Sequence, residues 1–155
     1  MGGGDVDETT AESAYELGTL IARNGWVLLN GGRNAGVMQA SAKGAAAAGG
    51  LTIGILPDDH KGRASEFIRI PILTGMGHAR NIINILSSDV VVACAGGAGT
   101  ISEIAIAVKQ SKPLILLNFM INDMVGENVA KGRVFSVRTP AQAIAKIRTI
   151  LNIPG

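Results

Sequence analysis

The sequence has little cysteine, few aromatic residues and little charge, and each shortage excludes a class of protein. Its one cysteine, Cys94, excludes a disulfide scaffold. Aromatic residues make up 3% of the chain and the formal net charge is +2, which argues against a nucleic-acid partner held by stacked bases. Because 47% of the residues are hydrophobic and only 17% are charged, the composition also excludes a disordered chain.

Long hydrophobic runs and a leader-like start are also missing. The first ten residues are acidic and glycine-rich, without the basic and apolar regions of a signal peptide. The apolar stretches stay short of the ~20 residues that a membrane-spanning helix needs. Together with the single cysteine, these features predict a cytoplasmic protein that does not bind a membrane.

What the sequence does contain is short aliphatic segments that alternate with helical patterns. Its 155 residues suffice for one domain, predicted to cover residues 1–155. Aliphatic segments almost unbroken by polar residues are typical of strands covered on both faces of a parallel sheet. The predicted strands are Trp26–Asn30, Leu51–Leu56, Asp89–Cys94 and Leu114–Leu117, with Ile68–Leu73 and Arg133–Val137 as weaker candidates.

Helical patterns fill the gaps between these strands. The predicted helices are Ala11–Asn24, Val37–Ala48, a helix that runs through Ile82 and Leu86, Ile101–Gln110, and Thr139–Leu151. Strand–helix alternation predicts right-handed crossovers, and therefore an α/β fold with a doubly wound, mainly parallel sheet. In such a sheet, ligands bind beyond the carboxyl ends of the strands.

Two glycine-rich loops each follow a predicted strand and precede a predicted helix. Residues 31–37 read GGRNAGV, and residues 95–100 read AGGAGT. Glycines let backbone N–H groups approach a ligand, and the helix N-terminus adds partial positive charge, so phosphate is the natural ligand. Either loop alone could equally serve helix–strand packing, but two in one chain favour phosphate binding. Neither loop matches the GxGxxG or GxxxxGK[ST] pattern, so the sequence supports neither a nicotinamide cofactor such as NAD nor ATP hydrolysis.

Two charged residues are further candidates for the site. Residues 74–81 read TGMGHARN and place Arg80 in the first turn of a helix, where a cation is unfavourable; this suggests an anionic partner, unless the side chain turns outward to water. Thr100 and Glu103 fit a capping box at the start of a helix. Glu103 also fits a carboxylate that lies at the carboxyl ends of the strands and holds ribose or pterin hydroxyls. No metal site is predicted, because His60 and His78 lack suitable companions.

Four segments together resemble the molybdenum cofactor carrier proteins. They are GGRNAGVMQASAKGA at 31–45, ILP at 55–57, TGMGHARN at 74–81 and SSDVVVACAGGAGTISEIAIA at 87–107. This family belongs to a wider superfamily with the cytokinin-activating phosphoribohydrolases, often labelled lysine decarboxylase-like. The resemblance covers most of the chain. It implies a Rossmann-like fold, a homo-oligomer (a dimer or a tetramer), and a site for a phosphorylated small molecule, the molybdenum cofactor (molybdopterin). No sequence feature supports pyridoxal phosphate, which the decarboxylase label would imply.

The resemblance also assigns residues. In the hydrolase branch an arginine, the lysine after it and a glutamate act on a nucleoside 5′-monophosphate, and here Arg80 and Glu103 match, as catalytic residues only if the chain is a hydrolase. The alternative to a carrier is therefore a phosphoribohydrolase that cleaves the N-glycosidic bond. Asn81 stands where the hydrolases have the lysine, and the loss of this cation weighs against hydrolysis. A structural or regulatory oligomer with a vestigial site is a third possibility. The expected ligand-binding residues are Gly31, Gly32, Arg33, Gly36, Gly75, Gly77, Arg80, Asn81, Gly96, Gly97, Gly99, Thr100 and Glu103.

The sequence departs from the family pattern at its start. The family begins with a strand that runs into a glycine-rich loop, whereas this sequence begins at the loop itself, with Met1-Gly2-Gly3-Gly4. We therefore expect either that the start is truncated or assigned to an internal methionine, or that the sheet lacks its first strand. A missing central strand would be compensated by packing or by oligomerisation.

Overall fold

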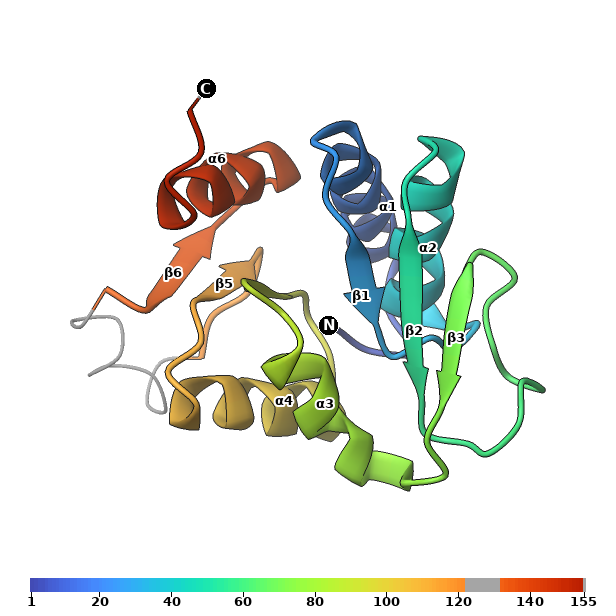
Figure 1. Ribbon diagram of the computed structural model, residues 1–155. Helices are drawn as coiled ribbons and strands as arrows, with labels where there is room; N and C mark the ends of the chain where they lie inside the picture. Colours follow the sequence, from blue (N-terminus) through green and yellow to red (C-terminus); the bar gives the residue numbers. More distant parts are fainter. Residues whose placement is uncertain (122–131, 155) are drawn as a thin grey trace.

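The computed structural model describes residues 1–121 and 132–154, and in them strands and helices alternate as the sequence predicts (Figure 1). The strands are β1 (Leu28–Asn30), β2 (Thr52–Leu56), β3 (Ile70–Leu73), β4 (Val91–Ala93), β5 (Leu114–Leu117) and β6 (Val134–Val137). The helices are α1 (Glu8–Arg23), α2 (Gly36–Ala47), α3 (Asn81–Leu86), α4 (Ala98–Lys109) and α6 (Pro140–Ile150), and a 3-10 turn, η1 (Gly77–Arg80), leads into α3.

The described strands form two three-stranded sheets, in the orders β1-β2-β3 and β4-β5-β6. Every pair is parallel, with Leu28 opposite Thr52 in one sheet and Leu114 opposite Val134 in the other. The parallel α/β prediction is confirmed. The continuous aliphatic run Asp89–Cys94 predicts a central strand, and this prediction is wrong for the described sheet, because β4 is an edge strand there and β5 is the strand with every residue buried. An aliphatic sequence shows that a strand is buried, but it does not show which strands lie beside it, and β4 and β5 are both aliphatic.

Helices cover both faces of the second sheet, which is why its middle strand, β5, is aliphatic throughout. Ile115 and Leu117 of β5 join a core with buried residues of α1, α2 and α6. Leu114 and Leu116 lie in a second core, together with buried residues of α3 and α4. Successive side chains of a strand point to opposite faces, so β5 contributes to both cores.

Helix boundaries follow their caps. Helix α1 begins three residues earlier than predicted, because the Asp7 carboxylate accepts the N–H of Thr10 at 2.7 Å and caps the helix. Helix α6 begins as predicted, with Thr139 and Gln142 forming a capping box ahead of Pro140. No helix in the described part of the chain is long and apolar enough to cross a membrane.

Candidate functional site

The two glycine loops that follow β1 and β4 lie together, and the N-terminal glycines join them. The carbonyl of Gly3 accepts the N–H of Val37, at the start of α2, at 3.0 Å. The N–H of Gly3 donates to the carbonyl of Ala95, in the second loop, also at 3.0 Å. Three glycine segments from distant parts of the sequence therefore meet at the carboxyl ends of β1 and β4, where an α/β sheet binds ligands.

Several of these glycines are required by close packing or by the backbone. Gly36 has a positive φ of 46°, and a Cβ there would overlap the carbonyl oxygen of Gly3. A Cβ on Gly96 would overlap the hydroxyl of Thr100, and one on Gly31 would lie 2.5 Å from Nη2 of Arg80. At these positions glycine is explained without a ligand.

Gly97 and Gly99, at the start of α4, are different. A Cβ on either residue would have no described atom within 4 Å, beyond its chain neighbours and its own helix. The φ of Gly97 is −89°, a value that any residue adopts, and Gly99 lies within the helix. Neither packing nor backbone conformation requires glycine here. What the two glycines provide is free access to the N–H groups of the helix N-terminus, which is what an anion needs.

Arg80 lies buried beneath the glycine loops. Only 8% of its surface is exposed, and its Nη1 donates to Oδ1 of Asn81 at 2.6 Å and lies 3.7 Å from Oε1 of Glu103. The expected anionic partner is therefore present, and the alternative of an outward-turned side chain is wrong. Burial lowers the pKa of the Arg80 guanidinium and nearby Arg33 lowers it further, whereas the Glu103 carboxylate raises it.

Glu103 is itself held in place by a residue of α3. The Nδ2 of Asn84 donates to Oε1 of Glu103 at 3.3 Å, and both side chains are buried. The predicted capping box of Thr100 and Glu103 is wrong, because α4 already begins at Ala98 and Gly97 occupies the N-cap position. The glycine before Ala98 lets the chain enter the helix one turn earlier, so Thr100 and Glu103 are both inside it. Glu103 is thus a partner of Arg80 and not a cap.

A second guanidinium lies beside Arg80. Arg33 donates through Nη2 to both carboxylate oxygens of Asp58, at 3.1 Å each. The two arginines line a small hollow of about 120 Å³ together with Pro57, Asp58, Gly77 and His78. Among residues 1–121 and 132–154, no acceptor meets the Nε of Arg33 or of Arg80, although both atoms are buried. Two guanidiniums with donors to spare, and one carboxylate, make this hollow suited to an anion.

The loop that carries Gly75 and Gly77 closes one side of this hollow. The N–H of Gly75 donates to the carbonyl of Asp58 at 3.3 Å, and the N–H of Gly77 donates to the carbonyl of Pro57 at 2.9 Å. These bonds fix η1, and with it Arg80, at the carboxyl end of β2. In the described residues no cluster of histidine, cysteine, aspartate or glutamate could hold a metal ion.

Sequence reasoning missed three residues of this arrangement: Gly3, Asp58 and Asn84. Asn84 could have been found, because it lies four positions after Arg80 on a helix whose other residues after Asn81 are isoleucine and leucine. Asp58 gave no such signal, since acidic residues in a loop after a strand are commonly solvated.

Comparisons with known proteins agree with this architecture. Residues 1–144 match the SLOG cluster4 family. The solved structure of the molybdenum cofactor binding protein from Rippkaea orientalis is 47% identical, with a TM-score of 0.91, and the match covers 97% of this chain and 94% of that one. The molybdenum cofactor carrier protein from Chlamydomonas reinhardtii is 42% identical, with a TM-score of 0.89, over 98% of this chain and 95% of that one. These likenesses confirm the Rossmann-like fold.

A weaker likeness points to the hydrolase branch. The cytokinin riboside 5′-monophosphate phosphoribohydrolase of Mycobacterium tuberculosis is 36% identical over 101 residues, which is 60% of this chain and 51% of that protein. The close structural neighbours are therefore cofactor binding and carrier proteins, and the hydrolase is a distant relative.

Proposed function

The chain belongs to the SLOG cluster4 family, and from its likeness to the molybdenum cofactor carrier proteins we propose that it binds and carries this cofactor, a phosphorylated pterin. The observation that carries the proposal is the open approach to Gly97 and Gly99 at the N-terminus of α4. Glycines that neither packing nor backbone geometry explains are accounted for by a ligand phosphate on the N–H groups of this turn.

The charged residues have complementary roles in this proposal. Arg80 and Arg33 supply positive charge and spare N–H donors for the anionic part of the ligand. Glu103 and Asp58 compensate that charge in the absence of a ligand. The proposed ligand-binding set remains that expected from the sequence. Asp58 is added as the residue that positions Arg33, and Asn84 as the residue that positions Glu103, the partner of Arg80.

Gly97→Val tests the phosphate site. We expect binding of the molybdenum cofactor to weaken at least about tenfold, because the valine side chain would cover the N–H groups at the start of α4. The melting temperature should change little, since the position is open. Ala46→Val, on the exposed side of α2, places the same valine side chain at a helix surface away from the site and serves as the control. Cofactor affinity that is equal in the two variants would refute the phosphate site.

A phosphoribohydrolase is the second candidate function, favoured by the Arg80–Glu103 pair and by the mycobacterial relative. Two observations weigh against it. Glu103 is 7% exposed and already paired with Arg80 and Asn84, so the pair would have to open before the carboxylate reached a ribose. Asn81 adds no cation where the hydrolases have one. Incubation with AMP decides between the two, because release of adenine requires the enzyme.

A cytoplasmic location is part of the proposal. Cys94 is a buried free thiol, and burial raises its pKa, so the sulfur stays protonated. A chain with this one cysteine needs no oxidising compartment to fold.

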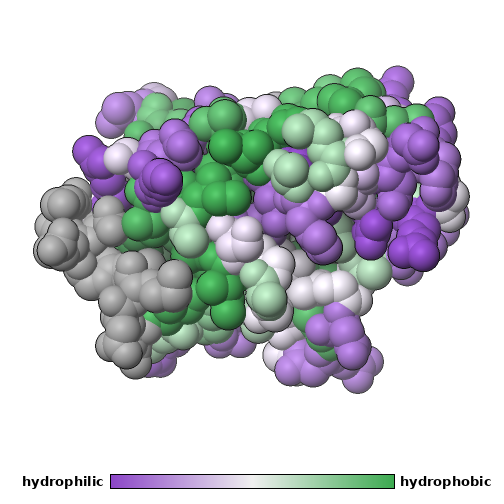
Figure 2. All heavy atoms as spheres, turned by 90° about the horizontal axis from the view of Figure 1, so that it is seen from below, coloured by the Kyte–Doolittle hydropathy of each residue, from purple (hydrophilic) through white to green (hydrophobic). Residues whose placement is uncertain are grey.

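We also propose that the protein is a homo-oligomer. Large apolar side chains are exposed on the edge strand β3, on α3, and beside them: Ile70, Ile72, Leu73, Met76, Ile82, Leu86 and Ile101. Figure 2 shows hydrophobic residues in continuous bands on the side seen from below, where α3 and α4 lie in Figure 1. Exposed apolar patches of this kind mark contact surfaces between proteins.

Light scattering tests this proposal. The wild-type chain should have a mass of at least twice 15.9 kDa at micromolar concentration. The double variant Ile82→Asp and Leu86→Lys, with both changes on the exposed side of α3, should be a monomer with unchanged circular dichroism. Tyr15→Lys, on α1, should leave the mass unchanged. A monomeric wild-type chain would contradict the proposal.

A further inference from the structure

The two arginines of the small hollow are each paired with a carboxylate. Arg33 bonds through Nη2 to both oxygens of Asp58, at 3.1 Å each, and Nη1 of Arg80 lies 3.7 Å from Oε1 of Glu103. These two ion pairs leave no net charge, so the hollow does not attract an anion by its charge alone. An anion that enters the hollow must compete with a carboxylate that already lies there.

The two carboxylates are held to different degrees. Glu103 lies inside α4, its side chain is 9% exposed, and it also accepts a hydrogen bond from Asn84. Asp58 lies in the loop after β2, its side chain is 21% exposed, and within the described residues its carboxylate bonds to Arg33 alone. Turning Asp58 into water costs little, because a partly exposed ion pair contributes little to stability, whereas separating Glu103 from Arg80 leaves a buried charge unpaired. Asp58 is therefore the carboxylate that an anion can replace.

The contact between Asp58 and Arg33 leaves donors unused. Both oxygens of Asp58 face one nitrogen, Nη2, so the parallel two-bond pairing in which a guanidinium also donates from Nε is not formed. The Nε atoms of Arg33 and Arg80 are buried, and no atom of the described part of the chain accepts their hydrogens. Buried donors without an acceptor are costly. An oxyanion such as phosphate has more acceptor oxygens than a carboxylate, so it can meet donors that Asp58 leaves free.

The charge of Asp58 acts on both arginines. Burial lowers the pKa of the Arg80 guanidinium, Glu103 raises it, Arg33 lowers it, and Asp58 raises it. Asp58 thus compensates the charge of Arg80 as well as that of Arg33. When Asp58 turns away, both guanidiniums lose this compensation at once, and an anion in the hollow restores it.

The size of the hollow limits what can replace Asp58. Its volume is about 120 Å³, well below the ~300–1,000 Å³ of pockets that enclose whole small-molecule ligands. Gly77 and His78, which are exposed, form part of its lining, so a group can enter from solvent. The hollow therefore takes one small anionic group, such as a phosphate, while the rest of a larger ligand stays outside.

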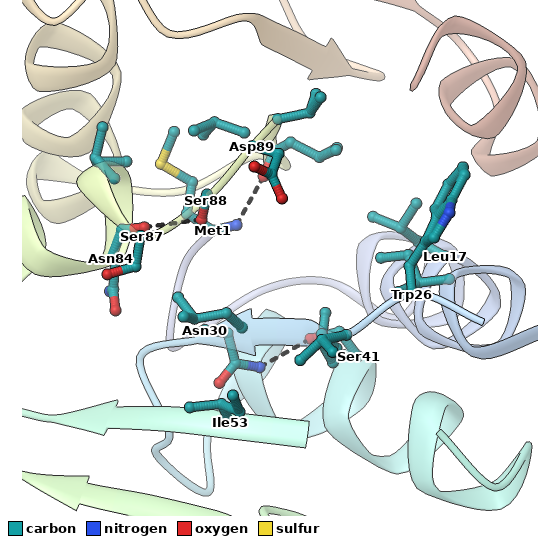
Figure 3. A pocket seen from close by; sticks show the side chains of 18 of the residues that line it. Met1, Leu17, Trp26, Asn30, Ser41, Ile53, Asn84, Ser87, Ser88 and Asp89 are labelled. Atoms are coloured by element: carbon teal, nitrogen blue, oxygen red, sulfur yellow. Dashed lines mark hydrogen bonds between the residues drawn. The ribbon is translucent and has the colours of Figure 1, made fainter. Parts of the chain in front are cut away.

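A larger cavity, of about 460 Å³ between β1 and β4, does not offer an anion the same contacts (Figure 3). Figure 3 shows the side chains of Asn30 and Ser41 hydrogen-bonded to each other, with 3.2 Å between Nδ2 and Oγ. The described residues that line this cavity include no arginine, lysine or histidine, and they include the carboxylates of Asp89 and Glu103. The smaller hollow, and not this cavity, has the donors that an anionic group needs.

We propose that Asp58 is a built-in competitor for the hollow: a phosphate-type oxyanion replaces its carboxylate on Arg33, and the carboxylate returns when the oxyanion leaves. Glu103 stays on Arg80 throughout. In the part of the inference that rests on the proposed function, the oxyanion is an anionic group of the carried cofactor. Asp58 then lowers the affinity and eases release, because it takes over the contact that the departing ligand gives up.

Inorganic phosphate is the probe that tests the exchange, and NMR detection of the Nε–H groups of Arg33 and Arg80 reports on the hollow itself. Arg33→Lys removes one of these signals and so identifies it. The comparison is between Asp58→Asn, which keeps the shape of the side chain without its charge, and Asp59→Asn, which makes the same change at the exposed neighbour. Physiological salt is used, because charges more than ~8 Å apart are then largely screened.

We expect Asp58→Asn to bind phosphate at least about tenfold more tightly than the wild-type chain, because the anion no longer competes with a charged acceptor. Asp59→Asn should differ from the wild-type chain by less than about twofold. Asp58→Ala should show the same gain as Asp58→Asn, which excludes a hydrogen bond from the new amide as its cause.

Three results would overturn the inference. Equal affinities of Asp58→Asn and Asp59→Asn would show that Asp58 does not compete for the hollow. Weaker binding in Asp58→Asn than in the wild-type chain would show that the ion pair must stay closed for an anion to bind. An Arg33 signal that phosphate leaves unmoved in every chain would show that the hollow takes no oxyanion.

Failure of the proposed function gives a different result. A chain that shows the expected gain with phosphate but does not bind the molybdenum cofactor has the exchange at Asp58 without being a carrier of this cofactor. A chain that binds the cofactor but shows no gain in Asp58→Asn is a carrier without the exchange.

Discussion

Gly44→Ala in α2 is expected to lower the free energy of unfolding by about 3 kcal/mol, the upper part of the range for overpacking. A Cβ on Gly44 would overlap the carbonyl oxygen of Tyr15 in α1, and a Cβ on Gly18 would overlap the carbonyl oxygen of Ser41 in α2. The two helices therefore approach each other backbone to backbone. Because the overlapping atom belongs to the main chain, a methyl group can be accommodated only by moving a helix.

Gly99→Ala in α4 is the matched control, because it makes the same substitution inside a helix. No described atom beyond the residue's own surroundings lies within 4 Å of a Cβ at Gly99. The substitution should therefore stabilise the fold, by up to about 1 kcal/mol, since alanine loses less backbone entropy than glycine in a helix. Urea unfolding measures both changes. Equal effects of the two substitutions would show that the α1–α2 contact is looser than the structure has it.

This helix contact also shows how far the sequence argument reaches. The small residues Ser41 and Gly44 indicate close packing, and the structure confirms that α2 packs closely. In an α/β fold such small residues predict close packing of the helix on the sheet, whereas the close contact that the structure shows is with α1. A pattern of small residues reveals that a backbone approaches, but not which one, because the approaching partner is set by the three-dimensional arrangement.

The sequence allows the position of the two glycine loops to be predicted, but not the contacts among the charged side chains of the candidate site. The strand–glycine–helix order of the two loops identifies the end of the sheet where they meet, because parallel strands place their carboxyl ends on one side. The network of Arg80, Glu103 and Asn84 depends on how α3 packs against α4, and the sequence does not contain that relation. The position of Asp58 opposite Arg33 depends likewise on the path of the loop after β2.

Arg80→Ala is expected to have two separate effects. It should destabilise the fold by about 3 kcal/mol, because it leaves the buried Glu103 carboxylate without its guanidinium. It should also weaken binding of the molybdenum cofactor by roughly 10- to 150-fold, the loss of a charged hydrogen bond of about 1.5–3 kcal/mol. The first effect follows from the ion pair alone, and the second requires that the ligand contacts Arg80.

A double variant, Arg80→Met with Glu103→Gln, separates these two effects. Neither residue then carries a charge, so no uncompensated charge is buried, and the methionine fills most of the space of the arginine stem. Urea unfolding should show that the double variant recovers most of the stability lost in Arg80→Ala. Cofactor binding should remain as weak as in Arg80→Ala, since methionine provides no donor and no positive charge. If binding recovers together with stability, Arg80 serves the fold alone, and the anion must be held by the glycine loops and Arg33.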